Sequence, residues 1–201
     1  MAQATETATK VAVADPAPLG LFGFATTTLV LSAANSNFTG VNAGGALTLA
    51  LAFGGLAQLL AGMWEFKNGN TFGGVAFSSY GTFWISFWAF LTIGPNTASL
   101  ESGANNLGWY LIGWAVVTGL LTLGTLRLNT GLTVVFVLLF ITYLLLAIGA
   151  FNPPAKGELP SPIAGYFGIA TAIAAYYVGL AGVLRSVGGM QLPVGGPLMK
   201  G

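Results

Sequence analysis

Six apolar segments of about 20 residues each follow one another along the chain, and this repeat limits the fold more than any other feature. An α-helix of about 20 residues is long enough to cross the roughly 30 Å hydrocarbon core of a bilayer. Alternation of apolar and polar residues, which is typical of a membrane β-barrel, is absent. The sequence therefore predicts an all-α integral membrane protein with six transmembrane helices per protomer. The predicted spans are residues 19–37, 43–63, 74–94, 106–127, 131–150 and 162–184.

Turn-forming residues separate these segments, which supports the division into six. On this division, residues 1–14 form a disordered cytoplasmic tail, residues 15–187 the membrane domain and residues 188–201 a cytoplasmic C-terminal tail. The breaks are Asn35-Ser36-Asn37, Lys67-Asn68-Gly69-Asn70, Gly94-Pro95-Asn96, Arg127-Leu128-Asn129 and Asn152-Pro153-Pro154.

Charge is scarce and unevenly placed. The 201 residues include six Lys or Arg and five Asp or Glu, too few to cover a soluble domain. Cytoplasmic loops carry the excess of Lys and Arg in membrane proteins, so the distribution predicts that both termini are cytoplasmic. A net charge of +1 gives no indication of nucleic-acid binding. With this orientation the cytoplasmic side holds Lys10, Lys67, Arg127, Arg185 and Lys200, and the outer side holds Lys156.

The residues that enzymes use are missing. The chain has no Cys and no His, and it shows no paired carboxylates within a span and no phosphate-binding P-loop. We therefore expect no catalysis, no metal, no cofactor and no ATP-driven transport. A passive or ion-coupled conduit for a small, weakly polar solute is the favoured function, and a weak acid in or near its neutral form fits such a path.

The second segment carries a stripe of small residues with one amide. Ala46, Ala50, Gly54, Gln58 and Gly62 recur every four residues. Small residues at this spacing let helix backbones approach closely, so the stripe predicts a tight helix contact. A polar amide at the depth of Gln58 must face protein or water. Gln58 therefore either lines a path or bonds a neighbouring helix.

Proton coupling would need a titratable group on the path. Asp15 and Glu65 are the acids closest to a membrane end, and Glu65 alternatively pairs with Lys67 or Arg127 at the cytoplasmic surface. The candidates for polar side chains along the path are Thr26, Gln58, Glu65, Ser79 and Thr142.

Three sequence blocks resemble the acetate uptake transporter family, which includes bacterial succinate–acetate permeases and fungal ammonia/acetate exporters. The opening Asp15-Pro16-Ala17-Pro18-Leu19-Gly20-Leu21 is similar to the NPAPLGL signature of that family, with Asp15 in place of Asn. A second block runs from Gly54 to Phe66 and continues from Gly69 to Trp84. The third is Leu145-Leu146-Ala147-Ile148-Gly149. The similarity covers about residues 15–185.

This resemblance implies six transmembrane helices per protomer, a homohexamer in the plasma membrane, and transport of acetate with succinate as a second substrate. It implies a path in each protomer, proton-linked or channel-like, entered at residues 15–21. It also implies a waist formed by Phe24, Tyr80 and Leu139. A channel for ammonium or a small neutral solute is the alternative function.

Asp15 is the departure from the family signature. Asp and Asn are both strong N-cap residues, so Asp15 is expected to cap the first helix. It also brings a negative charge to an entry used by anions.

Overall fold

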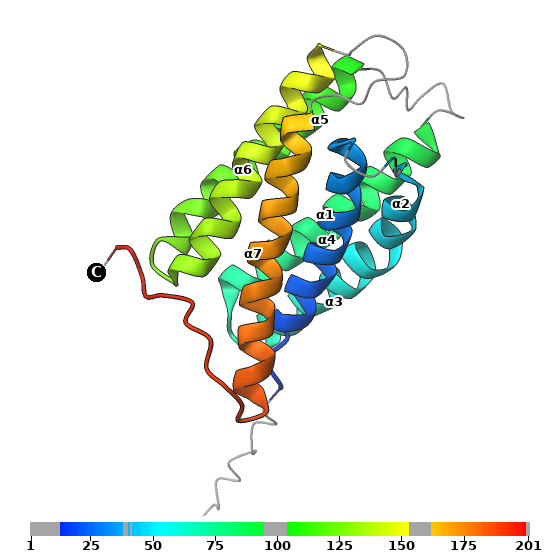
Figure 1. Ribbon diagram of the computed structural model, residues 1–201. Coiled ribbons are helices and arrows are strands. Elements are labelled where there is room, and N and C mark those ends of the chain that lie inside the picture. The colour runs from blue at the N-terminus through cyan, green and yellow to red at the C-terminus, as the bar shows by residue number, and fades with distance from the viewer. Residues whose placement is uncertain (1–12, 38–39, 41, 95–103, 153–161, 200–201) are drawn as a thin grey trace, which may run out of the picture.

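The computed structural model describes residues 13–37, 40, 42–94, 104–152 and 162–199, and within these residues every regular element is a helix (Figure 1). The predicted tail at residues 1–14 and the breaks at residues 94–96 and 152–154 lie largely outside the described residues. The helices are α1 (Ala17–Asn35), α2 (Gly44–Leu51), η1 (Ala52–Ala57), α3 (Gln58–Lys67), α4 (Thr71–Thr92), α5 (Ala104–Thr125), α6 (Thr130–Phe151) and α7 (Pro162–Ser186).

The elements α2, η1 and α3 follow one another without a break and form one rod. Its middle, η1, is a π-helix, a wider turn that is rare and often marks a functional site. Gly54 in this turn lies directly against α1, because a Cβ on Gly54 would be 2.8 Å from the Cβ of Thr27. The predicted stripe of small residues therefore does mark a close helix contact.

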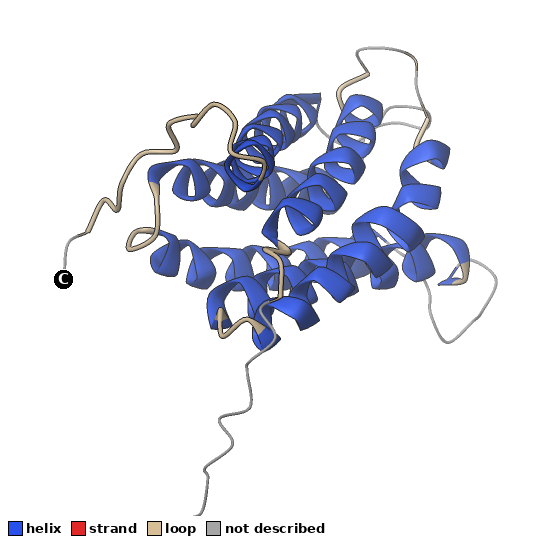
Figure 2. Ribbon diagram, turned by 90° about the horizontal axis from the view of Figure 1, so that it is seen from below, coloured by secondary structure: helices blue, strands red, loops and turns tan. Residues whose placement is uncertain are grey.

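The first and last helices, α1 and α7, lie side by side along their lengths (Figure 1). The Tyr176 hydroxyl donates to Thr26 Oγ1 at 2.8 Å across this pair. Glycines on α7 make room for α1, since a Cβ on Gly182 would lie 2.9 Å from Pro18 Cγ. Figure 2 shows the same helical bundle from below.

Two kinds of contact hold α4 to its neighbours. On one side its backbone touches the rod, because a Cβ on Gly81 would lie 2.6 Å from the backbone nitrogen of Leu59. On the other side large side chains span a wider gap to α5. The Tyr110 hydroxyl donates to the Phe83 carbonyl at 3.0 Å, and the rings of Phe83 and Trp114 lie 5.1 Å apart.

The described helix ends agree with the predicted spans within three residues, except at the end of α3. That helix runs to Lys67, whereas the predicted span ends at residue 63. In the sequence, the charged residues Glu65 and Lys67 indicate that the span has already ended. In the structure, the helix continues through both of them and ends just before Gly69, which adopts a φ of +83°. Asn70 then starts α4 by accepting a hydrogen bond from the Gly73 nitrogen at 3.0 Å.

Five helices in the described part are long and apolar enough to cross a membrane: α1, the rod formed by α2, η1 and α3, α5, α6 and α7. The helix α4 does not meet the same measure of hydropathy, although its 22 residues would span about 33 Å. Its sequence is rich in Ser, Thr, Gly, Tyr and Trp, and one face of it is buried in the bundle.

The C-terminal segment, residues 187–199, is irregular but tied to the bundle. The backbone nitrogens of Leu198 and Met199 both donate to the Leu126 carbonyl at 2.9 Å, and the Gly131 nitrogen donates to the Val194 carbonyl at 2.8 Å. The Tyr177 hydroxyl donates to the Pro193 carbonyl at 2.9 Å. The segment therefore runs from the end of α7 to the turn between α5 and α6 (Figure 1).

Candidate functional site

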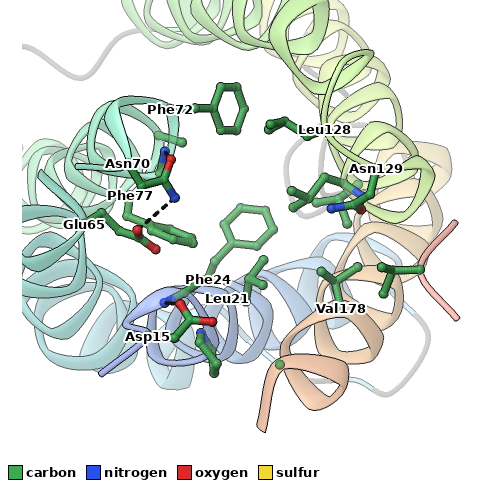
Figure 3. Close-up of a pocket in the computed structure, with 18 of the residues that line it drawn as sticks. Asp15, Leu21, Phe24, Glu65, Asn70, Phe72, Phe77, Leu128, Asn129 and Val178 are labelled. Atoms are coloured by element: carbon green, nitrogen blue, oxygen red, sulfur yellow. Dashed lines mark hydrogen bonds between the residues drawn. The ribbon is translucent and has the colours of Figure 1, made fainter. Parts of the chain in front are cut away.

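A cavity of about 330 Å³ opens among the helix ends at the end of the bundle where α1 begins and α7 ends. Figure 3 shows part of its lining, with Glu65 and Asn70 on one wall and Leu128 and Asn129 on the opposite wall. Its walls come from α1, α3, α4, α6 and α7. The rim residues are Asp15, Asn70, Leu128, Asn129, Arg185 and Val194.

Phe24, Tyr80 and Leu139 form the inner end of the cavity, so the structure brings together the three residues that the resemblance implies. Each is buried, with 3–4% of its surface exposed. The rings of Phe24 and Tyr80 lie 5.8 Å apart. No described residue that lines the cavity lies beyond this level on α1, α4 or α6, so the cavity ends there.

The phenol of Tyr80 is fixed in this position. Its hydroxyl donates to Thr118 Oγ1 on α5 at 3.0 Å, and the Thr118 side chain is fully buried. The Phe136 ring packs 5.9 Å from the Tyr80 ring in an edge-on arrangement. The phenol thus presents an apolar ring to the cavity while its polar atom is satisfied elsewhere.

Gln58 lines the cavity with an amide that has no partner. It is 1% exposed, and neither its Nε2 nor its Oε1 makes a hydrogen bond to any described residue. A buried amide without a partner is costly, so such a group is free to bond water or a solute. The geometry favours path lining over a bond to a neighbouring helix for Gln58.

Glu65 also lies in the cavity wall, not at the surface, and it is 2% exposed. Its Oε2 accepts a hydrogen bond from Asn70 Nδ2 at 2.8 Å, while its Oε1 has no described partner. The alternative pairing with Lys67 or Arg127 is wrong. The Lys67 ammonium instead lies over the Trp64 ring, 5.1 Å from its centre.

Three other polar candidates lie outside the cavity. Thr26 accepts the hydrogen bond from Tyr176 between α1 and α7. The Thr142 hydroxyl donates to the Leu138 carbonyl at 2.8 Å, and its Oγ1 lies 3.4 Å from Thr171 Oγ1. Ser79 is half-buried on α4 and does not line the cavity.

The proline-rich opening contributes part of the rim. Its N-cap position is held by Pro16 rather than Asp15, yet Asp15 Oδ1 still accepts a hydrogen bond from the Ala17 nitrogen at 3.0 Å. The Ala17 N–H, which has no partner within the helix, is thereby bonded by the residue just before the N-cap position. The residues of the opening that line the cavity are Asp15, Ala17, Pro18 and Leu21, whereas Pro16, Leu19 and Gly20 do not.

Sequence reasoning missed most of the apolar lining and several residues that shape the site. Phe136 lies one turn before Leu139 on α6, a spacing that places both on one face. Asn70 appears in the sequence as a break, although an Asn directly before a helix is a typical N-cap. Nothing in the sequence marks Thr118 as the partner of Tyr80, or Arg185 as a rim residue, because both depend on tertiary packing.

Most of the cavity wall is apolar. Its polar side chains are Gln58 and Glu65 in the wall and Asp15, Asn70, Asn129 and Arg185 at the rim. Among the described residues no three His, Cys, Asp or Glu side chains lie close enough together to hold a metal ion. The cavity can hold a small solute between its open mouth and its closed inner end.

The sequence model of the GPR1/FUN34/yaaH family matches residues 2–194. The chain is 40% identical over 186 residues to acetate permease A of Emericella nidulans, covering 86% of this chain and 62% of that protein. It is 38% identical over 184 residues to the succinate-acetate/proton symporter SatP of Escherichia coli, covering 91% of this chain and 96% of SatP. The chain thus spans about three fifths of the fungal relative and nearly all of the bacterial one.

A solved structure of the bacterial acetate channel SatP has the same fold. It superposes on the chain with a TM-score of 0.82 at 36% sequence identity, and it covers 92% of this chain and 100% of the channel. The agreement extends along nearly the whole length of both chains, so the arrangement of helices around the cavity is that of a known membrane channel.

Proposed function

Because the chain belongs to the GPR1/FUN34/yaaH family, we propose that it conducts acetate and other small carboxylates, succinate among them, across a membrane. Transport is proton-linked, and no bond of the solute is made or broken. The path runs through each protomer, with the described cavity as one half of it and the level of Phe24, Tyr80 and Leu139 as its gate.

The observation that carries this proposal is the closed inner end of the cavity. Three large side chains from three different helices meet there, and a ring of apolar bulk excludes water when closed. Gln58 lies on the cavity side of this ring with both polar atoms unpaired. Its Nε2 is a hydrogen-bond donor of the kind that a carboxylate needs.

The proposed topology has six transmembrane spans. They are the five helices that are apolar enough to cross a membrane and, in addition, α4. Aromatic and hydroxyl residues lower the hydropathy of α4, but its packing inside the bundle limits its contact with lipid. Lys67, Arg127 and Arg185 all lie at the helix ends around the cavity mouth. By the positive-inside rule the cavity opens to the cytoplasm, and both termini lie on that side.

The proposed assembly is a homohexamer in the plasma membrane. Large apolar side chains on the outer face of α5 support contact with lipid or with a neighbouring protomer. Trp109 is 69% exposed, Leu120 65% and Leu123 64%. Native mass spectrometry of the detergent-extracted protein would measure the number of copies.

Uptake of labelled acetate into proteoliposomes that carry the full chain tests the function. We expect uptake above that of empty vesicles. The Phe24→Ala variant should raise the initial rate severalfold, because removal of the ring widens the gate. Phe22→Ala is the matched control. Phe22 lies on the same helix as Phe24, but it packs against Tyr176 of α7 and does not line the cavity.

The proposal fails if no uptake above empty vesicles occurs with or without a pH gradient. Stopped-flow shrinkage of the same vesicles with ammonium or urea separates the alternative function. A fast response to either solute, without acetate uptake, would identify a channel for ammonium or a neutral solute.

A further inference from the structure

Among the described residues, one buried acid, Glu65, lies between the mouth of the cavity and its gate. Glu65 and Gln58 are seven residues apart on one helix, so both face the same side, two turns apart. Figure 3 shows Glu65 on the wall beside Phe77 and below Asn70, with its carboxyl group facing the cavity. A solute that moves from the mouth to Gln58 therefore passes this group.

Two opposing influences act on the Glu65 carboxyl. It is 2% exposed and has one hydrogen bond for two oxygens, and an ionised carboxylate that is incompletely paired is costly to bury. The first turn of α4, however, carries partial positive charge and lies directly against it. A Cβ on Gly73 would be 2.8 Å from Glu65 Cδ. Both the neutral and the ionised form are therefore accessible.

The charged and titratable groups around Glu65 do not neutralise it. The segment before α1 contributes a second acid, Asp15, and α7 contributes Arg185 at the exposed rim. From α4 comes the Tyr80 phenol, which is bound to Thr118. The part of α6 that lines the cavity contributes no charged residue, and no ion pair joins Glu65 to any described cation.

We propose that Glu65 is the proton-binding residue that sets the pH dependence of this path, an inference that rests on the proposed function. When Glu65 is neutral, its Oε1 donates a hydrogen bond within the cavity if it holds the proton, and otherwise accepts one. The carboxylate of the solute then reaches Gln58. When Glu65 is ionised, it repels the carboxylate before the gate. The proton comes from water at the mouth, and Asn70 holds the carboxyl in place in both states.

The test is the pH profile of acetate uptake by proteoliposomes with equal pH inside and outside, from about pH 6 to about pH 8, where acetate is almost wholly anionic. In the wild type the initial rate should fall with rising pH on the order of tenfold, the effect of one charge about 10 Å away. The E65Q variant, which is isosteric and always neutral, should keep the low-pH rate throughout. The E65D variant should restore the decline.

The comparison variant is D15N, which removes the other acid of the cavity from its exposed rim. Its rate should still decline with rising pH, whatever its absolute value. A wild-type decline that persists in E65Q would overturn the inference, and so would a profile flattened by D15N but not by E65Q. Absence of uptake by the wild type would contradict the proposed function instead.

A second measurement does not depend on transport or on the folding of E65Q. Infrared titration of the purified D15N protein should show the C=O stretch of a buried carboxylic acid, lost as the pH rises. The same band should shift in E65D. Absence of a titrating band would overturn the inference even if every variant transports acetate.

Discussion

At the scale of the residue, Tyr80 combines packing inside the bundle with the gating role that we propose for it. Its ring contacts Phe24 and Phe136, and its hydroxyl is held by Thr118 at 3.0 Å. The ring cannot rotate away from the gate without breaking this hydrogen bond in a buried place, and a buried donor or acceptor left unpaired is costly. In the proposed path, this hydrogen bond therefore holds the gate closed.

We predict that Tyr80→Phe raises the basal acetate flux, because the ring keeps its volume but loses its tether. The free energy of unfolding should fall by about 1 kcal/mol, the usual worth of one hydrogen bond. Uptake rates and thermal melting in detergent measure both effects.

Tyr110→Phe is the matched control for this prediction. Tyr110 donates to the Phe83 carbonyl and does not line the cavity, so its loss should lower stability without raising flux. Equal flux changes in both variants would show that the hydrogen bond of Tyr80 has no special part in gating.

Residues also show where the sequence falls short. The composition predicts that the chain has no catalytic or metal-binding side chains. The resemblance to the family predicts Phe24 and Tyr80 as residues of the waist. Glu65 was different, because a charged residue near Lys67 resembles a surface pair in sequence. Only the fold reveals that α4 packs over it at Gly73.

At the scale of the element, α3 and α4 form a hairpin whose backbones touch. Gly62 lies against the backbone of Ser78, and Gly81 lies against the backbone of Leu59 at the other end of the contact. Without a hydrophobic driving force between helices in lipid, such close packing is a main source of helix association. The position of Tyr80, next to Gly81, depends on it.

We predict that Gly62→Ala destabilises the protein by about 1–3 kcal/mol, the usual cost of overpacking, because the added methyl meets the Ser78 backbone. The measurement is the melting temperature by tryptophan fluorescence in detergent.

Gly113→Ala on α5 is the matched control, since a Cβ there meets nothing within 4 Å. It should be neutral or stabilise the protein by up to about 1 kcal/mol, because Ala favours helix more than Gly does. A similar loss in both variants would contradict the proposed role of the close contact.

The positions of the helices were the most predictable part of the fold. They follow from runs of apolar residues, and the described ends agree within three residues except at the end of α3. The π-turn of η1 could not be predicted, since it reflects the fit of Gly54 against Thr27 on another helix. Local sequence carries little information about such tertiary fits.

At the scale of the whole molecule, the C-terminal segment closes part of the cavity mouth. Val194 lines the cavity, and its carbonyl accepts a hydrogen bond from the Gly131 nitrogen. Backbone groups nearby in the segment bond Leu126 and Tyr177. The segment thus links the end of α7 to the turn that starts α6. The sequence predicts these residues only as a tail, because they have no helical or strand pattern.

We predict that deletion of residues 190–201 raises the initial rate of acetate uptake, because the mouth widens and the turn between α5 and α6 loses its main-chain partners. Uptake into proteoliposomes measures the change.

Leu198→Gln is the control for the deletion. Leu198 is 58% exposed and holds the turn through its backbone nitrogen, so the side-chain change should leave the rate at the wild-type value. A wild-type rate in the deletion variant would show that the segment does not restrict the mouth.

The pairing of α1 with α7 has a consequence for synthesis on the ribosome. The ribosome makes α1 well before its partner α7, and the cavity wall between them includes Leu21 from one and Val178 from the other. That wall cannot form until α7 has been made. A chain that stops before α7 therefore lacks this side of the cavity.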